Sequence, residues 1–117
     1  MAESYRDLAV WNRAMQLCVA LYRLTAVFPP EEMNGITSQL RQAGVTIASN
    51  IAEGSGRQAP GENKRLLGAA RGAVMEVQTL LTISAELGFG SEEMRTLAEG
   101  LSNEVAKMLL TLMARMG

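Results

Sequence analysis

The residues that could do chemistry are concentrated in one run, Ser49-Asn50-Ile51-Ala52-Glu53-Gly54-Ser55-Gly56-Arg57. Ser and Asn are mediocre helix formers, so their place in the last turns of a helix indicates side-chain hydrogen bonds. Two interpretations are open: Asn50, Glu53 and Arg57 either form a structural polar network at the helix end or bind a small ligand. We favour the network, because one carboxylate without a partner base or metal is a weak catalyst.

Other catalytic constellations are excluded by composition. The chain of 117 residues has no histidine and one cysteine, Cys18, so histidine triads, the usual metal clusters and an internal disulfide are impossible. Gly54-x-Gly56 resembles a phosphate loop, but it follows a helix and lacks the Lys-Ser/Thr that should come next. The sequence therefore predicts a protein that is not an enzyme and has no metal or cofactor, with Cys18 a small buried hydrophobe.

A second candidate site is a cluster of basic residues. The formal net charge is only −1, yet residues 41–75 carry five basic residues against two acidic ones. The five are Arg41, Arg57, Lys64, Arg65 and Arg71. They could contact the phosphates of RNA, but no aromatic residue accompanies them for base stacking. Solvated or intersubunit ion pairs are the favoured interpretation, with acidic residues 76–117 as a source of partner charges.

Three breaks divide the chain into four segments that must position these residues. They are Phe28-Pro29-Pro30, then 54–61, then Leu87-Gly88-Phe89-Gly90-Ser91. The segments are rich in Ala, Leu, Met, Glu and Arg, which favours helices over strands. Four helices of this length joined by short loops predict one all-α domain over 1–117, an antiparallel up-down-up-down four-helix bundle.

Helix ends and core faces follow from the same pattern. We expect Asp7 to cap the first helix, Gly54 to end the second in a left-handed conformation, Gly88 to end the third and Ser91 to cap the fourth. The expected core side chains of the first helix form two rows: Trp11, Met15, Cys18, Tyr22 and Thr25, and beside them Val10, Leu17, Leu21, Leu24 and Phe28. Those of the second are Ile36, Leu40, Ala43, Ile47 and Ile51; of the third, Leu66, Leu67, Ala70, Val74, Val77, Leu80, Leu81, Ser84 and Leu87; of the fourth, Met94, Leu97, Leu101, Val105, Met108 and Leu112.

Apolar residues outside these stripes predict an interface. Met75, Ile83, Leu109, Leu110, Met113 and Met116 lie beyond the expected core of the last two helices. Either they meet another subunit or they are scattered exposed residues, which is common. No run approaches the roughly 18 apolar residues of a membrane span, and no signal peptide is expected, so we predict a cytoplasmic protein without a membrane partner.

The motifs in their order resemble a bacterial family. The run 49–57 resembles the four-helix bundle proteins of the 23S ribosomal RNA intervening-sequence type, and so do 7–15, Phe28-Pro29, 35–43, Arg71-Gly72-Ala73 with Glu76, and 87–89. The sequence departs from that pattern at Ala48, where the family usually has proline, at Gly44, usually alanine, and at Asn63, usually aromatic.

The resemblance implies a small all-α subunit that assembles as a ring-shaped homopentamer. Related proteins serve retroelements as accessory factors that bind reverse transcriptase and nucleic acid. We therefore expect a homo-oligomeric scaffold or adaptor, whose partners are its own copies and possibly RNA or another protein. A nucleic-acid-binding accessory factor with a basic patch repeated around a ring is the alternative.

Overall fold

Four long helices make up most of the chain, joined by short turns. The computed structural model describes residues 4–56 and 59–116. A short 3-10 helix η1 (Tyr5–Asp7) precedes α1 (Ala9–Thr25), and a second one, η2 (Pro30–Glu32), precedes α2 (Ile36–Gly56). The last two helices are α3 (Pro60–Leu87) and α4 (Glu92–Ala114). Within the described ranges no residue is in a β-strand.

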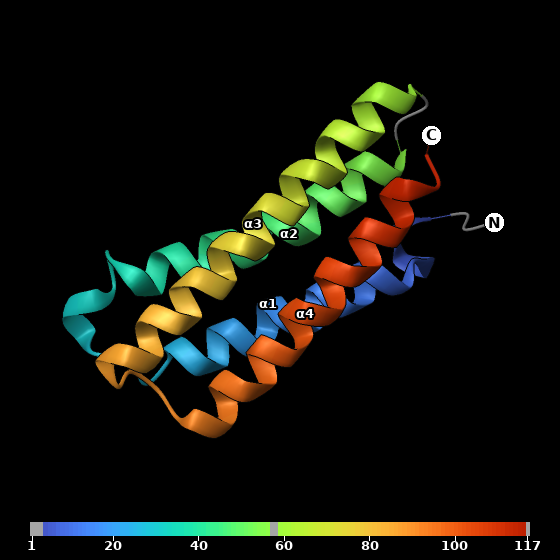
Figure 1. Ribbon diagram of the computed structural model, residues 1–117. Helices are drawn as coiled ribbons and strands as arrows, with labels where there is room; N and C mark the ends of the chain where they lie inside the picture. The colour runs from blue at the N-terminus through green and yellow to red at the C-terminus, as the bar shows by residue number, and fades with distance from the viewer. Residues whose placement is uncertain (1–3, 57–58, 117) are drawn as a thin grey trace.

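The helices pack as a bundle in which each one touches two others. Contacts join α1 with α2, α2 with α3, α3 with α4 and α4 back to α1, whereas α1 and α3 share none among the described residues. The chain direction alternates from helix to helix (Figure 1). The all-α antiparallel bundle predicted from the sequence is confirmed, because short loops can only return the chain beside the preceding helix.

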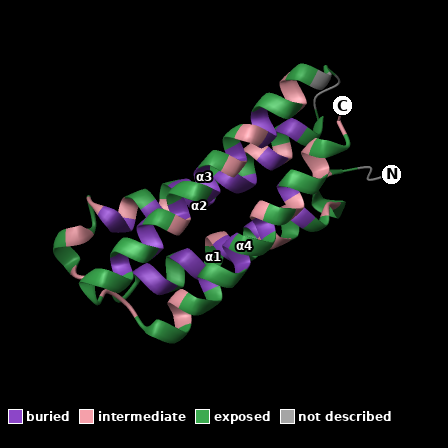
Figure 2. Ribbon diagram, viewed as in Figure 1, coloured by how far each residue is buried: buried purple, intermediate pink, exposed green. Residues whose placement is uncertain are grey.

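One apolar core runs through the bundle, and all four helices contribute buried residues to it (Figure 2). The largest fully buried side chains include Leu17, Leu40, Leu67 and Leu109. The predicted core stripe of α2 is buried at every position from Ile36 to Ile51. In α3 only Leu87 departs from prediction, because it lies at the exposed end of the helix.

Two helix ends form as predicted. The Ser91 Oγ accepts a hydrogen bond from the Met94 N–H at 3.1 Å, which caps α4. Gly88 ends α3 in the left-handed conformation, with a φ of 73°. The Gly88 N–H donates to the Ala85 carbonyl and the Phe89 N–H donates to the Ser84 carbonyl, the pattern of a Schellman turn.

Two other predicted ends are wrong. Asp7 belongs to η1 and the residue before α1 is Leu8, which has no side-chain cap. Gly54 is buried inside α2, which continues to Gly56. A Cβ on Gly54 would lie 3.2 Å from the Leu66 Cβ, so this glycine serves the close approach of α2 and α3 rather than a turn.

The predicted core face is shifted on α1 and α4. Met15 and Tyr22 are exposed, and Cys18 is only half-buried, because their row lies at the edge of the α1 core face. On α4, Leu97 is exposed and Leu109 is fully buried, the reverse of the prediction. The buried row of α4 contains the small residues Ala98 and Ser102, at helical spacing with Leu109. Small residues give a weak hydrophobic signal in the sequence, so this row was not recognised as the core face.

By length and composition, one described helix could cross a membrane. It spans Gly61–Leu87, and 44% of its most apolar window is buried against the other helices. The central helix of a packed bundle has the same length and composition, so this is weak evidence for a span.

Candidate functional site

The polar run at the end of α2 lies beside the start of α3. Asn50 is half-buried and Glu53 is exposed. Glu53 lies near the Arg65 guanidinium and contributes to its raised pKa. Arg57 lies outside the described residues, so the network of Asn50, Glu53 and Arg57 stays a prediction.

Arg41 holds α2 against α1. Its Nε donates to the Thr25 Oγ1 at 2.8 Å and its Nη2 donates to the Tyr22 carbonyl at 3.4 Å. The guanidinium carbon lies 4.7 Å from the centre of the Tyr22 ring, a cation–π contact. These contacts occupy N–H donors of the planar Arg41 guanidinium within the bundle, so fewer donors remain for a phosphate.

The remaining basic residues lie along the first half of α3. The Arg65 Nε donates to a Glu62 carboxylate oxygen at 3.0 Å, and this pairing is the main cause that raises the pKa of Arg65. Lys64 is exposed, whereas Arg71 is half-buried and its Nε has no hydrogen-bond partner among the described atoms.

The structure separates Arg41 from Lys64 and Arg65 along the bundle. Arg41 precedes the end of α2 by 15 residues and Lys64 follows the start of α3 by four. At a rise of about 1.5 Å per residue the two lie roughly 16 Å apart along the axis. By the same measure Arg71, 11 residues after the start of α3, is only about 6 Å from Arg41 along the axis, so the described basic candidates spread along α2 and α3 rather than forming one cluster.

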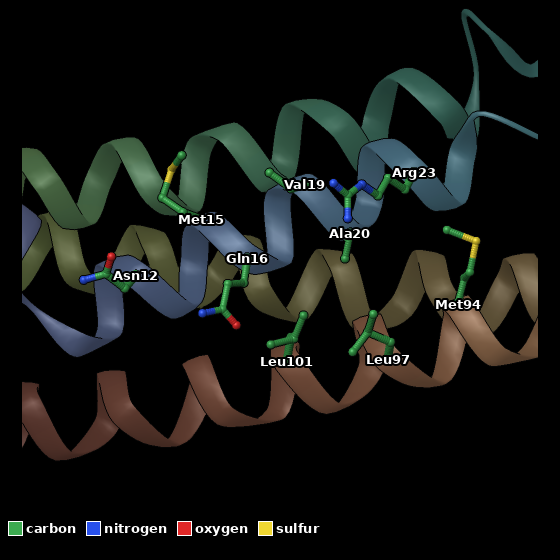
Figure 3. Close-up of a pocket in the computed structure, with 9 residues that line it drawn as sticks. All are labelled: Asn12, Met15, Gln16, Val19, Ala20, Arg23, Met94, Leu97 and Leu101. Carbon is green, nitrogen blue, oxygen red and sulfur yellow. The ribbon is translucent and has the colours of Figure 1, made fainter.

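A groove of about 460 Å³ lies between α1 and α4. Ala20, Leu97 and Leu101 lie between the two helices, with Asn12 and Arg23 toward opposite ends (Figure 3). None of its lining residues is an acid, a cysteine or a hydroxyl nucleophile. The groove can accept apolar side chains, but it offers no group for catalysis.

The polar side chains beside this groove are already paired. The Asn12 Nδ2 donates to the Arg6 and Leu8 carbonyls at 3.0 Å each, which ties η1 onto α1. Arg13 donates through Nη1 to the Gln16 Oε1 and lies 2.9 Å from the Glu104 carboxylate through Nε. Among the groove residues, Arg23 makes no ion pair with another described residue, so its charge is available to a partner.

A second cavity, of about 540 Å³, lies where the first described residues meet the end of α2 and the start of α3. Its walls include Leu8, Ala52, Leu67 and Leu112. Asn63 also lines it, and the Asn63 Oδ1 is buried with no hydrogen-bond partner among the described atoms. A buried amide oxygen without a partner destabilises the fold.

Eleven large hydrophobic side chains of the described residues are exposed. The predicted exposure of Met75, Ile83 and Leu110 on α3 and α4 is confirmed, while Met113 and Met116 pack partly against the core. A second group, which the sequence placed in the core, includes Met15 and Tyr22 on α1. The sequence signal for this outward stripe is Val19, which lies four residues after Met15 and three before Tyr22 and so continues an apolar row with them.

A model of the 23S rRNA-intervening sequence protein family matches residues 6–111. The chain belongs to this family. The match spans all four helices, so the resemblance drawn from the motifs is confirmed. No curated protein matches the sequence.

A solved structure has the same fold. It is a crystal structure of a protein of unknown function from the S23 ribosomal protein family of Bacteroides thetaiotaomicron. It covers 90% of this chain and 95% of its own, with a TM-score of 0.81 and 19% sequence identity. At this identity the likeness shows the shared bundle and carries no residue roles.

The described residues hold no cluster suited to a metal, since no three His, Cys, Asp or Glu side chains lie together. Cys18 is the described thiol, and partial burial raises its pKa. A raised pKa keeps the sulfur protonated and weakly nucleophilic at neutral pH.

Proposed function

We propose that this chain is a non-catalytic subunit of a homo-oligomer, a pentamer, that acts as a scaffold or adaptor. The carrying observation is the set of exposed apolar side chains on α3 and α4, represented by Met75 and Leu110, which are 36% and 50% exposed. Large apolar side chains left exposed outside a small core are typical of a surface that binds another protein. A subunit that contributes surfaces and no reactive groups fits a scaffold.

The test is the mass of the assembly in solution by light scattering. We expect five times the subunit mass of 12.6 kDa. Met75→Glu should split the assembly and keep the helical circular dichroism, because an unpaired buried charge costs several kcal/mol in an interface but little on a free surface. Thr96→Glu, at an exposed position of α4, is the control and should leave the mass unchanged.

The same two measurements, light scattering and circular dichroism, can also refute the proposal. A parent protein with the mass of one subunit would refute it. Loss of helical signal in Met75→Glu would place that side chain in the bundle core instead of the interface.

A nucleic-acid-binding accessory role is the second candidate, favoured by the excess of basic residues in 41–75. A small patch repeated around a ring gains affinity through avidity, and binding should weaken steeply as salt rises. The test is a salt titration of binding to a structured RNA, comparing the parent with Lys64→Glu and with the control Lys107→Glu, an exposed lysine of α4. Equal binding by all three proteins, or none at low salt, would refute this role.

A further inference from the structure

We infer that copies of this chain associate head to tail, with the outer face of α1 in one copy against the outer face of α3 in the next. The inference rests on the homo-oligomeric function proposed above and adds which surfaces meet. It differs from an interface confined to α3 and α4, because it assigns half of each contact to α1.

The first surface is an apolar stripe on α1. Met15, Val19 and Tyr22 follow one another at spacings of four and three residues, so they share one side of the helix. They are 38%, 43% and 44% exposed. The core row of α1, from Val10 to Leu24, is buried on another side of the same helix, so this stripe lies at the edge of the bundle and is only partly covered, with the Arg41 guanidinium over the Tyr22 ring.

Neighbouring helices widen this stripe into a surface. Leu97 of α4 is exposed beside the groove that Val19 lines, and Val45 of α2 is exposed in the hollow that Tyr22 lines. We call Met15, Val19, Tyr22, Val45 and Leu97 the α1 face. Tyr and Met are common at the centres of protein interfaces, where large side chains contribute much contact area.

The second surface lies on α3. Met75, Thr79 and Ile83 follow one another at spacings of four residues and are all exposed. The Thr79 Oγ1 donates to the Met75 carbonyl at 2.9 Å, so the hydroxyl is already paired and its methyl group is left for packing. We call Met75, Thr79 and Ile83 the α3 face.

The two faces point away from each other. α1 and α3 each contact α2 and α4 but do not contact one another among the described residues, so they are the diagonal pair of the bundle. A ring of more than two subunits needs two different surfaces on each subunit, because every subunit has a neighbour on either side. A two-fold dimer would use one face and leave the other exposed.

The charges around the two faces are complementary. Across 12–26 the charged residues are Arg13 and Arg23, and Arg13 is already paired with Glu104. Across 71–87 the charged residues are Glu76 and Glu86, both exposed, and the half-buried Arg71, one turn before Met75, so the region around the α3 face is acidic on balance. Contact between an α1 face and an α3 face therefore brings Arg23 toward carboxylates, whereas two α3 faces would oppose four carboxylates.

The experiment disables one face at a time. Val19→Glu places a charge in the α1 face and Met75→Glu places one in the α3 face. Each variant alone should have the mass of one subunit, because each contact needs both faces. A 1:1 mixture should form a species of twice the subunit mass, because Met75→Glu keeps its α1 face and Val19→Glu keeps its α3 face.

Light scattering and pull-down of one variant by a tagged copy of the other both measure this outcome, and circular dichroism checks the fold. If either variant misfolds, Met15→Glu and Ile83→Glu replace the pair, since both side chains are exposed. An oligomeric parent whose variants stay assembled, or whose mixed variants remain single subunits, would overturn the head-to-tail inference and leave the oligomer standing. A parent with the mass of one subunit would instead overturn the proposed function itself.

Discussion

The turn between α3 and α4 contains two left-handed glycines in different surroundings, which makes a matched pair of substitutions. Gly88 and Gly90 have φ angles of 73° and 74°. A Cβ on Gly88 would have no other heavy atom within 4 Å. A Cβ on Gly90 would lie 2.7 Å from the Leu24 Cδ1 and 2.9 Å from the Phe28 Cε1. Both of those side chains are buried, so neither can move aside freely.

The expected losses of stability follow from these surroundings. An alanine in the left-handed region costs about 1–2 kcal/mol, which is the whole effect expected for Gly88→Ala. Gly90→Ala adds the cost of overpacking, about 1–3 kcal/mol, for a total of about 2–5 kcal/mol. The entropy of unfolding for a chain of this length makes 1 kcal/mol worth about 4 °C in Tm. We expect a fall of about 4–8 °C for Gly88→Ala and about 8–20 °C for Gly90→Ala.

The assay is thermal unfolding followed by circular dichroism at 222 nm, with all proteins at one subunit concentration because association adds to apparent stability. Equal falls in Tm for the two variants would show that Leu24 and Phe28 yield to the added methyl group. That result would refute the claim that the α3–α4 turn packs tightly against the α1 end of the core.

Three further substitutions or reactions test other parts of the structure. Gly54→Ala should lower the free energy of unfolding in urea by about 1–3 kcal/mol, because the new Cβ meets the Leu66 Cβ, whereas Gly72→Ala, with open space around it, should be neutral or stabilising. Asn63→Leu should raise the free energy of unfolding by about 1–2 kcal/mol by removing a buried oxygen without a partner; a loss would mean that Asn63 is hydrogen-bonded in solution. Alkylation of Cys18 near pH 8 should be slower in the folded protein than in urea, because burial raises the thiol pKa and lowers the thiolate fraction. Because the thiol pKa is higher in the folded protein, the contribution of Cys18 to stability should decline as the pH rises above the ordinary thiol pKa. Equal alkylation rates in the folded protein and in urea would contradict the burial of Cys18.

Local chemistry explains which features the sequence predicts correctly. The cap at Ser91 and the stop at Gly88 depend on one residue and its immediate neighbours, so the pattern is sufficient. The core stripe of α2 is likewise confirmed, because Ile36, Leu40 and Ile47 stand at clear helical spacing. The run 49–57 marks the family, and the polar network predicted for it stays a prediction because Arg57 lies outside the described residues.

The errors arise where a residue has two suitable environments. Gly54 satisfies the rule for a helix end, yet its missing side chain is needed where α2 touches Leu66. Met15 and Leu97 are as apolar as true core residues, and only the angle at which α1 and α4 pack leaves both exposed. Charge is ambiguous in the same way, since Arg41, a candidate for phosphate contact, also lies against Tyr22.

The sequence by itself determined the four helices, their alternating direction and the family, because these follow from periodicity, short loops and ordered motifs along one chain. Only the tertiary structure decided which apolar rows face inward, since that depends on where neighbouring helices lie rather than on the helix alone. It also decided that α1 and α3 form opposite corners of the bundle and turn uncovered apolar faces away from one another. The hydrophobicity of the sequence indicates how much apolar surface must be buried, whereas the packing of the helices determines which apolar side chains remain exposed.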